Sequence, residues 1–280
     1  MTKQTHTNIP KNFQYPEIKP EHYRFGSGQL IGTPLREDGD WRDYLPPTED
    51  QNQRGVESSA CYVEGSQHCL AVLQEEAFNL PDKNYSARFN ALLSNSSVFG
   101  GDPLAAGQSF RHDGLIPDTM MPFGKDIASW DDFHSWKGVN EKNARAKGQK
   151  WLTEWKPEYD IVFTREETAM SKYIKLKNVL KFCPVPISVS AWYENNGMYV
   201  KPPGSIDNHL VLAVFLDEQN RLHILDTYAP YLKILEPYFN CDFAMRWHLK
   251  NLSTPPITKN WLWDIISLLK EFFKDVFFKW

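Results

Sequence analysis

The sequence has few cysteines, and their spacing does not indicate a structural role. The 280 residues include four cysteines, at positions 61, 69, 183 and 241. No CxxC pair occurs, and no cysteines and histidines are spaced as in a zinc finger. A chain this long buries about three quarters of its unfolded surface and needs neither disulfides nor a metal to fold. We therefore expect no metal, no cofactor and a reducing environment.

The sequence also lacks an excess of basic charge and a leader peptide. It has 31 Lys and Arg against 35 Asp and Glu, a net charge of −4, and no long basic run. Nucleic acid is therefore not an expected partner, because phosphate binding needs a basic surface. Residues 1–7 contain no apolar run of the kind that a secretory signal has. We expect a cytoplasmic or virion-associated protein.

What is present indicates an arm, a folded body and a separate C-terminal segment. Residues 1–39 are polar, contain four prolines and read as an extended arm. The body spans 40–252, a linker with Pro255-Pro256 spans 253–259, and 260–280 has apolar residues at helical spacing. We expect this last helix to be amphipathic and to contact a protein assembly, a membrane surface or the catalytic body.

The spacing of apolar residues in the body changes halfway along, from a helical to a strand-like period. Helical patterns are predicted over about 59–78, 84–93, 103–112, 137–156 and 165–181. Residues 187–192 alternate as in a strand, 209–216 are almost continuously apolar, and 217–220 form a turn into a returning strand over 221–226. The sequence therefore predicts an α+β fold with a helical N-terminal half, an antiparallel β-rich C-terminal half and a cleft between them.

Three residues could carry chemistry in that cleft. Cys61 lies near the start of the first helix, where the helix dipole favours a thiolate. His209 opens the apolar strand, and the hairpin pairing brings Asp226 toward it, so that the acid could orient the imidazole. Each has a plainer interpretation: a core cysteine, a structural histidine and a capping carboxylate. Together they have the order of a papain-like Cys and His site.

Several segments in this order resemble the papain-like cysteine peptidases, in a divergent branch seen in bacteria and phages. The segments are Asp40-Trp41-Arg42 to Asp50-Gln51, like the entry motif; Ser58-Ser59-Ala60-Cys61-Tyr62, where the family has G-S-C-W; Phe99-Gly100-Gly101-Asp102-Pro103, like N-G-G-x-P; Asn208-His209-Leu210-Val211-Leu212, like N-H-A-V-x-L; and Leu225-Asp226-Thr227-Tyr228, like D-S-[WY]-G. The resemblance spans about residues 40–250 and implies a papain-like two-lobed fold.

The resemblance also implies roles for individual residues. Cys61 would be the nucleophile, His209 the general base and acid, and Asp226 the orienting residue, in place of the family's commoner Asn. Gln51, or alternatively Gln53, would donate its amide to the oxyanion. The substrate would pair with the backbone of Gly100 and Gly101 and would contact Tyr228 at the cleft. The arm is short for the family's helical inhibitory propeptide, so the resemblance does not predict control by that route.

The leading hypothesis is therefore a cysteine endopeptidase acting on polypeptides through an acyl-enzyme. One alternative keeps the site but gives it a peptidoglycan peptide as substrate, as in lytic enzymes. Another is a non-enzymatic virion or assembly protein on the same fold. The chemistry requires the three side chains to meet beside a groove, and a sulfur enclosed away from solvent would speak against it.

Overall fold

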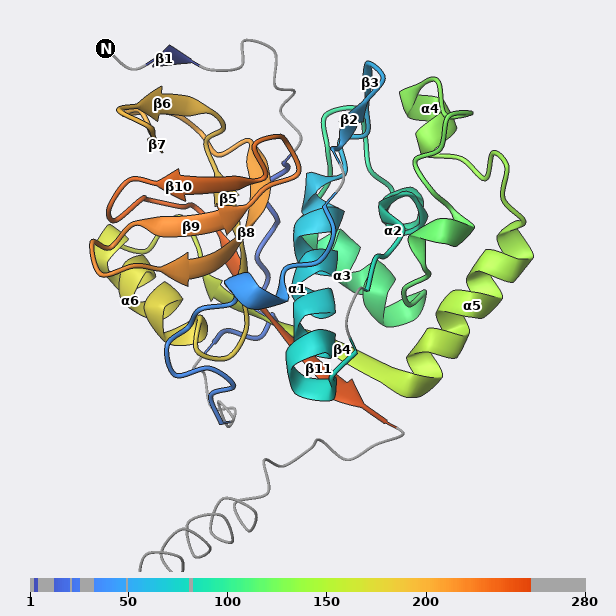
Figure 1. The fold of residues 1–280 in the computed structure, drawn as a ribbon, viewed down its shortest axis with the longest axis horizontal. Helices are drawn as coiled ribbons and strands as arrows, with labels where there is room; N and C mark the ends of the chain where they lie inside the picture. The colour runs from blue at the N-terminus through green and yellow to red at the C-terminus, as the bar shows by residue number, and fades with distance from the viewer. Residues whose placement is uncertain are drawn as a thin grey trace, which may run out of the picture.

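The computed structural model describes residues 3–4, 13–20, 22–25, 33–48, 50–80 and 83–252. The predicted linker at 253–259 and the amphipathic helix at 260–280 lie outside these residues. Among the helices described, none is long and apolar enough to cross a membrane. The fold is α+β, with a large, mostly antiparallel sheet that has helices α1 to α5 on one side and α6 on the other, as Figure 1 shows.

The sheet has nine strands over the described residues, in the order β1-β6-β7-β10-β9-β8-β5-β11-β4. Their bounds are Lys3–Gln4 (β1), Trp155–Phe163 (β4), Val185–Val189 (β5), Tyr193–Asn195 (β6), Met198–Tyr199 (β7), His209–Leu216 (β8), Leu222–Leu225 (β9), Leu232–Leu235 (β10) and Ala244–Asn251 (β11). A separate hairpin pairs Asn52–Gln53 (β2) with Val56–Glu57 (β3). Strand β8 is near the middle of the sheet, and its first six residues are buried.

The helical side begins with α1, Cys61–Phe78, which lies against β8. The other helices are Ala87–Leu93 (α2), Pro103–His112 (α3), Trp130–Phe133 (α4), Glu141–Glu154 (α5) and Ala169–Val179 (α6), with short 3-10 turns at Arg42–Tyr44 and Asp118–Met120. Trp41 is fully buried, and its ring N–H donates to the carbonyl of Leu180 at 2.6 Å. Its own backbone N–H donates to Val214 of β8, which fixes the entry segment beside the central strand.

The predicted elements are largely confirmed, with two corrections. The helix over 137–156 begins at Glu141 and ends at Glu154, where strand β4 follows at once. Strands β4 and β11 were not predicted, because neither shows a regular alternation of apolar and polar residues. Strand β4 is rich in charged residues, and β11 is buried only in its first half. The first helix begins at Cys61, and its N-cap is Ala60, with no side-chain hydrogen bond.

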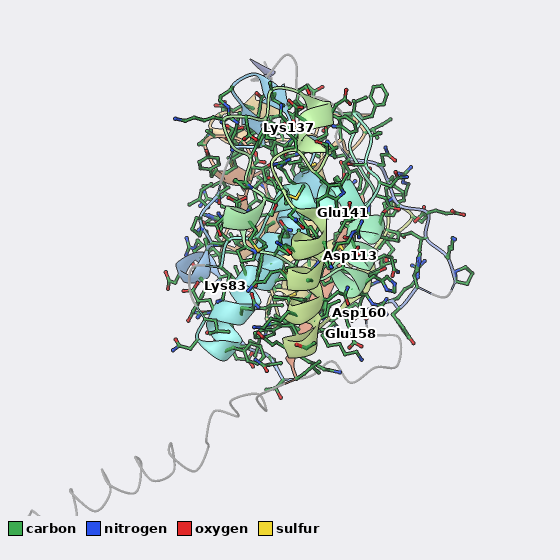
Figure 2. All side chains as sticks on the ribbon, turned by 90° about the vertical axis from the view of Figure 1, so that its right-hand side faces the viewer. Lys83, Asp113, Lys137, Glu141, Glu158 and Asp160 are labelled. Atoms are coloured by element: carbon green, nitrogen blue, oxygen red, sulfur yellow. The ribbon has the colours of Figure 1, made fainter. Side chains whose placement is uncertain are left out.

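Helix α5 presents a charged face away from the sheet. Figure 2 shows this face, with Glu141 at the start of the helix and Asp113 beside it. Arg145 pairs with Glu141 at 2.8 Å and lies 3.8 Å from Asp113. These are exposed pairs, each worth about 0.5 kcal/mol. They account for the polarity of this helix without a binding role.

Candidate active site

The hairpin of β8 and β9 brings His209 and Asp226 together. Leu212 pairs with Leu225, so His209 at the start of β8 and Asp226 just after β9 share the open end of the hairpin. His209 Nε2 lies 2.6 Å from Asp226 Oδ1, and both side chains are fully buried. His209 Nδ1 has no hydrogen-bond partner among the described residues. The nitrogen left for proton transfer is therefore Nδ1.

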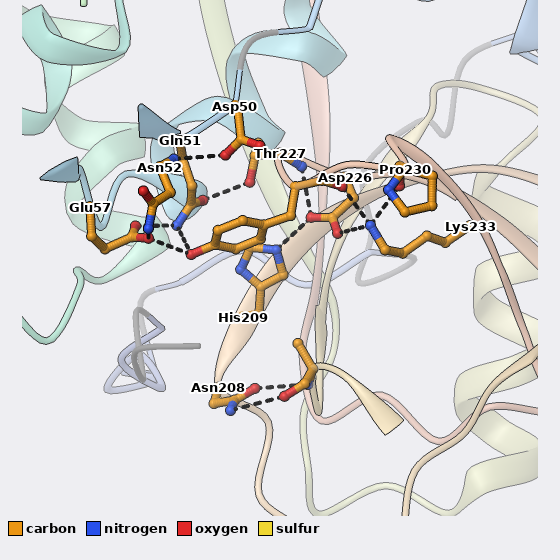
Figure 3. Close-up of polar contacts among 12 residues, drawn as sticks. Asp50, Gln51, Asn52, Glu57, Asn208, His209, Asp226, Thr227, Pro230 and Lys233 are labelled. Carbon is orange, nitrogen blue, oxygen red and sulfur yellow. Dashed lines mark hydrogen bonds and ion pairs between the residues drawn. The ribbon is translucent and has the colours of Figure 1, made fainter. Parts of the chain in front are cut away.

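The histidine ring is held from both sides. Its ring centroid lies 5.7 Å from that of Trp192, edge to face, and 5.3 Å from that of Tyr228. Asn208, immediately before it, anchors the start of the strand, because its side-chain oxygen accepts the backbone N–H of Ala191 at 2.8 Å (Figure 3). The imidazole is thus fixed by packing as well as by the carboxylate.

Cys61 is the first residue of α1 and has no exposed surface. Its surroundings include the backbone N–H of Leu210, the residue that follows His209. Burial raises the pKa of the Cys61 thiol well above its usual value, although that N–H opposes the shift, and Glu64, Glu57 and Asp226 raise it further. The expectation that the helix start lowers this pKa is therefore wrong for the enclosed thiol, because desolvation outweighs the dipole.

Gln51 lies beside this group, and its amide is already engaged. Its Nε2 donates to Glu57 Oε1 at 2.7 Å and to the Tyr228 hydroxyl at 2.6 Å, while its Oε1 accepts from Thr227 (Figure 3). Gln53, the alternative donor, accepts a hydrogen bond from Arg54 and lines a separate pocket with His68. The structure therefore brings Gln51, and not Gln53, next to the residues that follow Asp226.

Glu57 is a residue of this site that the sequence analysis missed. Its carboxylate accepts from Gln51, from the Tyr228 hydroxyl at 2.8 Å and from the backbone N–H of Ser59 at 3.0 Å. The predicted substrate contact of Tyr228 is thus occupied by Glu57. Burial raises the pKa of Tyr228, and the charge of Glu57 raises it further. The β2–β3 hairpin, with Arg54 and Gly55 both at positive φ in its turn, places Glu57 here.

The N-terminal arm occupies the predicted substrate positions. Phe13 forms a parallel bridge with Gly101, and its N–H donates to the carbonyl of Asn208 at 3.2 Å. The next residue, Gln14, donates its N–H to Gly101 at 3.1 Å and its side-chain amide to the carbonyl of Gly100. The arm therefore links the loop before α3 to the strand that carries His209.

The pockets given by the described residues do not include the expected groove. None of the pockets described is lined by Cys61, His209 or Asp226. The reason lies in the two contacts above: the arm takes the backbone groups of Gly101 and Asn208, and Glu57 takes the amide of Gln51. No group of three or more histidine, cysteine, aspartate or glutamate side chains suited to a metal occurs among the residues described.

Gly101 cannot accept a side chain. A Cβ there would lie 2.4 Å from the ring of Tyr62, the residue after Cys61. We expect Gly101→Ala to destabilise the fold by about 1–3 kcal/mol, because Tyr62 is fully buried and must shift. Urea unfolding measures this effect. Gly65→Ala is the control: its Cβ would make an ordinary contact at 3.6 Å with Leu210, so it should be neutral or stabilising. Equal effects at both sites would contradict this account.

Comparison with solved structures identifies the fold. Xylellain, a cysteine protease from Xylella fastidiosa, has a TM-score of 0.58 at 15% identity, covering 89% of this chain and 100% of that one. Procathepsin B S9 from Trypanosoma congolense has a TM-score of 0.59 at 13% identity, covering 86% and 87%. A Carica candamarcensis cysteine protease, CMS1MS2, in complex with E-64 has a TM-score of 0.53 at 17% identity, covering 76% and 97%.

These neighbours are all papain-like cysteine proteases, and the chain has the papain-like fold. No protein-family model matches the sequence. No curated protein sequence matches it either.

Proposed function

We propose that this chain is a papain-like cysteine endopeptidase of the bacterial or phage-type branch, with Cys61, His209 and Asp226 as its catalytic residues. The observation that carries the proposal is the 2.6 Å contact between His209 Nε2 and Asp226 Oδ1, with Nδ1 left unpartnered. Cys61, beside Leu210, supplies a thiol on the same strand end. The papain-like fold of the chain supports the same reading.

The chemistry follows from which nitrogen is available. Asp226 accepts a hydrogen bond from the Nε2–H group, so Nδ1 takes the thiol proton of Cys61 and the sulfur attacks the peptide carbonyl carbon. The developing oxyanion is bound by the Gln51 amide and the Cys61 backbone N–H. The Nδ1 proton then passes to the leaving amine, which departs and leaves a thioester. Water, deprotonated by Nδ1, hydrolyses the thioester and regenerates the thiol.

On this proposal, the enclosed sulfur of Cys61 corresponds to a closed form of the enzyme. The covering contacts are of two kinds, an extended arm held by backbone hydrogen bonds and the side chain of Glu57. The stretch of the arm at Phe13 and Gln14 and the side chain of Glu57 lie outside the hydrogen-bond ladders of the sheet strands and of α1, so both can withdraw without unfolding those elements. On this proposal a polypeptide substrate competes with the arm for Gly101 and with Glu57 for Gln51.

Loosening the arm should therefore expose Cys61. Phe13 is buried and packs on Phe243 and Tyr15, so Phe13→Ala removes the main apolar anchor of the arm. We expect at least about tenfold faster alkylation of Cys61 by iodoacetamide, followed by mass spectrometry, since such truncations cost about 3–5 kcal/mol. Alkylation should also begin at lower pH, because hydration removes the cause of the raised pKa.

Phe25→Ala is the matched control for this test. Phe25 packs on Phe182, and its N–H bonds to Ile161, away from Gly101 and Asn208. Its truncation should leave the alkylation rate of Cys61 unchanged. If both variants react at the rate of the parent protein, the arm is not what covers the sulfur.

The burial of Cys61 favours one other function specifically, a non-enzymatic virion or assembly protein in which the site never opens. An epoxide electrophile discriminates between the two. Selective reaction at Cys61 supports the peptidase, with Cys69, Cys183 and Cys241 as internal controls, and failure to react in the Phe13→Ala protein supports the assembly role. Cleavage of peptidoglycan peptides but not of casein would select the lytic-enzyme alternative.

A further inference from the structure

Asp226 has a second partner on the side away from His209. Lys233 of β10 reaches it with Nζ 2.5 Å from Oδ2, and both side chains have no exposed surface. Figure 3 shows the order His209, Asp226, Lys233 along a line of dashed contacts. Burial of a charged lysine is unfavourable unless the charge is paired, so the position of Lys233 next to the orienting Asp226 requires an explanation.

The contacts of Nζ show that this lysine is an ammonium. It donates to Asp226 Oδ2 and, at 2.6 Å each, to the carbonyls of Tyr228 and Pro230. Three acceptors match the three N–H groups of a charged lysine, and a neutral amine would leave one acceptor without a donor. Burial lowers the pKa of Lys233, but Asp226 acts against that shift.

The negative charge of Asp226 disfavours the thiolate form of Cys61. Burial would raise the pKa of the Asp226 carboxyl, but His209 and Lys233 bring it below its usual value, so the group is a carboxylate. An uncompensated carboxylate stabilises a charged imidazole but repels a nearby thiolate, and Asp226 is one of the groups that raise the pKa of Cys61. A neutral orienting group would hold the ring without this repulsion.

We propose, on the basis of the function above, that Lys233 is a positioning residue that neutralises Asp226, so that the Asp226–Lys233 pair acts on His209 as a single neutral hydrogen-bond acceptor. The pair orients the imidazole through Oδ1, while the ammonium on Oδ2 cancels the field that would otherwise reach Cys61. The remaining charged or titratable groups facing this cluster are Asp50, Glu57, Cys61, Tyr199 and Tyr228. They are unchanged in every variant below.

The test is a charge-balance cycle in the full chain carrying Phe13→Ala, the background in which turnover is measured, and this protein is the parent of the variants below. Lys233→Met leaves a bare carboxylate and should move both limbs of the pH–activity profile to higher pH by about one unit or more. Asp226→Asn leaves a bare ammonium and should move both limbs to lower pH. The double variant, Asp226→Asn with Lys233→Met, is neutral again and should return both limbs toward those of the parent, with activity above either single variant.

A readout without turnover separates this proposal from the proposed function. The ring titration of His209, followed by NMR with ¹³C-labelled histidine, should shift up in Lys233→Met, down in Asp226→Asn and back in the double variant, whether or not any peptide is cleaved. If the Phe13→Ala protein cleaves nothing but these shifts occur, the peptidase proposal fails and the charge balance stands.

Lys172→Met is the control for loss of any buried lysine, since Lys172 contacts Asn240 on the α6 side of the sheet and does not contact Asp226. It should leave the His209 titration unmoved. If Lys233→Met does not fold, the proposal is still tested by comparing the His209 titration in Asp226→Asn with that in the double variant. A His209 titration that is the same in these two proteins, or a shift of the same sign in both single variants, overturns the proposal.

Discussion

A Cys61→Ala protein is expected to lose peptide hydrolysis by about 10⁴-fold or more, because no other group in the site can form the thioester. The fold should survive, since the change removes one sulfur from the start of α1 and no hydrogen bond of the helix ladder. The measurement is casein or fluorogenic-peptide turnover by the Phe13→Ala protein with and without the Cys61 substitution, because in the parent chain Cys61 is fully buried and the arm is bound to Gly101 and Asn208.

Cys69→Ala is the matched control, a second buried cysteine two turns further along the same helix. It loses a contact of its sulfur with the carbonyl of Pro184 and should reduce stability slightly without reducing turnover. Equal turnover by the Phe13→Ala protein with and without the Cys61 substitution would remove Cys61 from the mechanism. Loss of turnover in the Cys69 variant at full stability would contradict the assignment in the same way.

The local pattern was enough to predict the part of the site that one hairpin builds. A turn at 217–220 between two apolar strands sets the register of β8 and β9, and the register alone places Asp226 beside His209. The start of α1 at Cys61 was likewise predicted to within two residues. These features depend on residues close in sequence or on a single strand pairing, so the pattern of apolar and polar residues is sufficient to predict them.

The place of Lys233 in the site could not be predicted, because the pattern of apolar and polar residues in its strand does not indicate that the lysine is buried. In Leu232-Lys233-Ile234-Leu235 the lysine faces the core and Leu232 is 58% exposed, the reverse of the usual alternation. Which face of β10 is buried depends on its pairing with β9, where Leu232 lies opposite Leu225. The carboxylate that makes burial of the lysine possible comes from another segment, and only the tertiary structure brings the two together.

The enclosure of Cys61 was also beyond the sequence. The arm was predicted to be extended, and it contacts Gly101 and Asn208 through backbone groups that any residue possesses. Such contacts leave no mark in the side-chain pattern. The same holds for the backbone of Ser59, whose φ of 57° turns the chain into α1 at a position where the resembled family has glycine.

The second large effect concerns Glu57, whose removal should increase activity. Its carboxylate holds the Gln51 amide, which the proposed mechanism needs for the oxyanion, and its charge raises the pKa of Cys61. A hydrogen bond to a charged group is worth about 1.5–3 kcal/mol, so freeing the amide corresponds to about a 10- to 100-fold gain. We expect that gain in kcat/KM for Glu57→Ala, measured in the Phe13→Ala protein.

Two further variants separate the amide from the charge. Glu64→Gln removes another acid that raises the pKa of Cys61 and leaves the hydrogen bond between Glu57 and Gln51 in place, so it should give the electrostatic part of the gain alone. In a Gln51→Ala protein, Glu57→Ala should give no more than Glu64→Gln does, because there is no amide left to free. A full gain in that background would mean that Glu57 acts only through its charge, and that Gln51 is not the oxyanion donor. A gain that depends on Gln51 would instead make the carboxylate of Glu57 an internal occupant of the oxyanion site, which a substrate carbonyl must displace before the sulfur can attack.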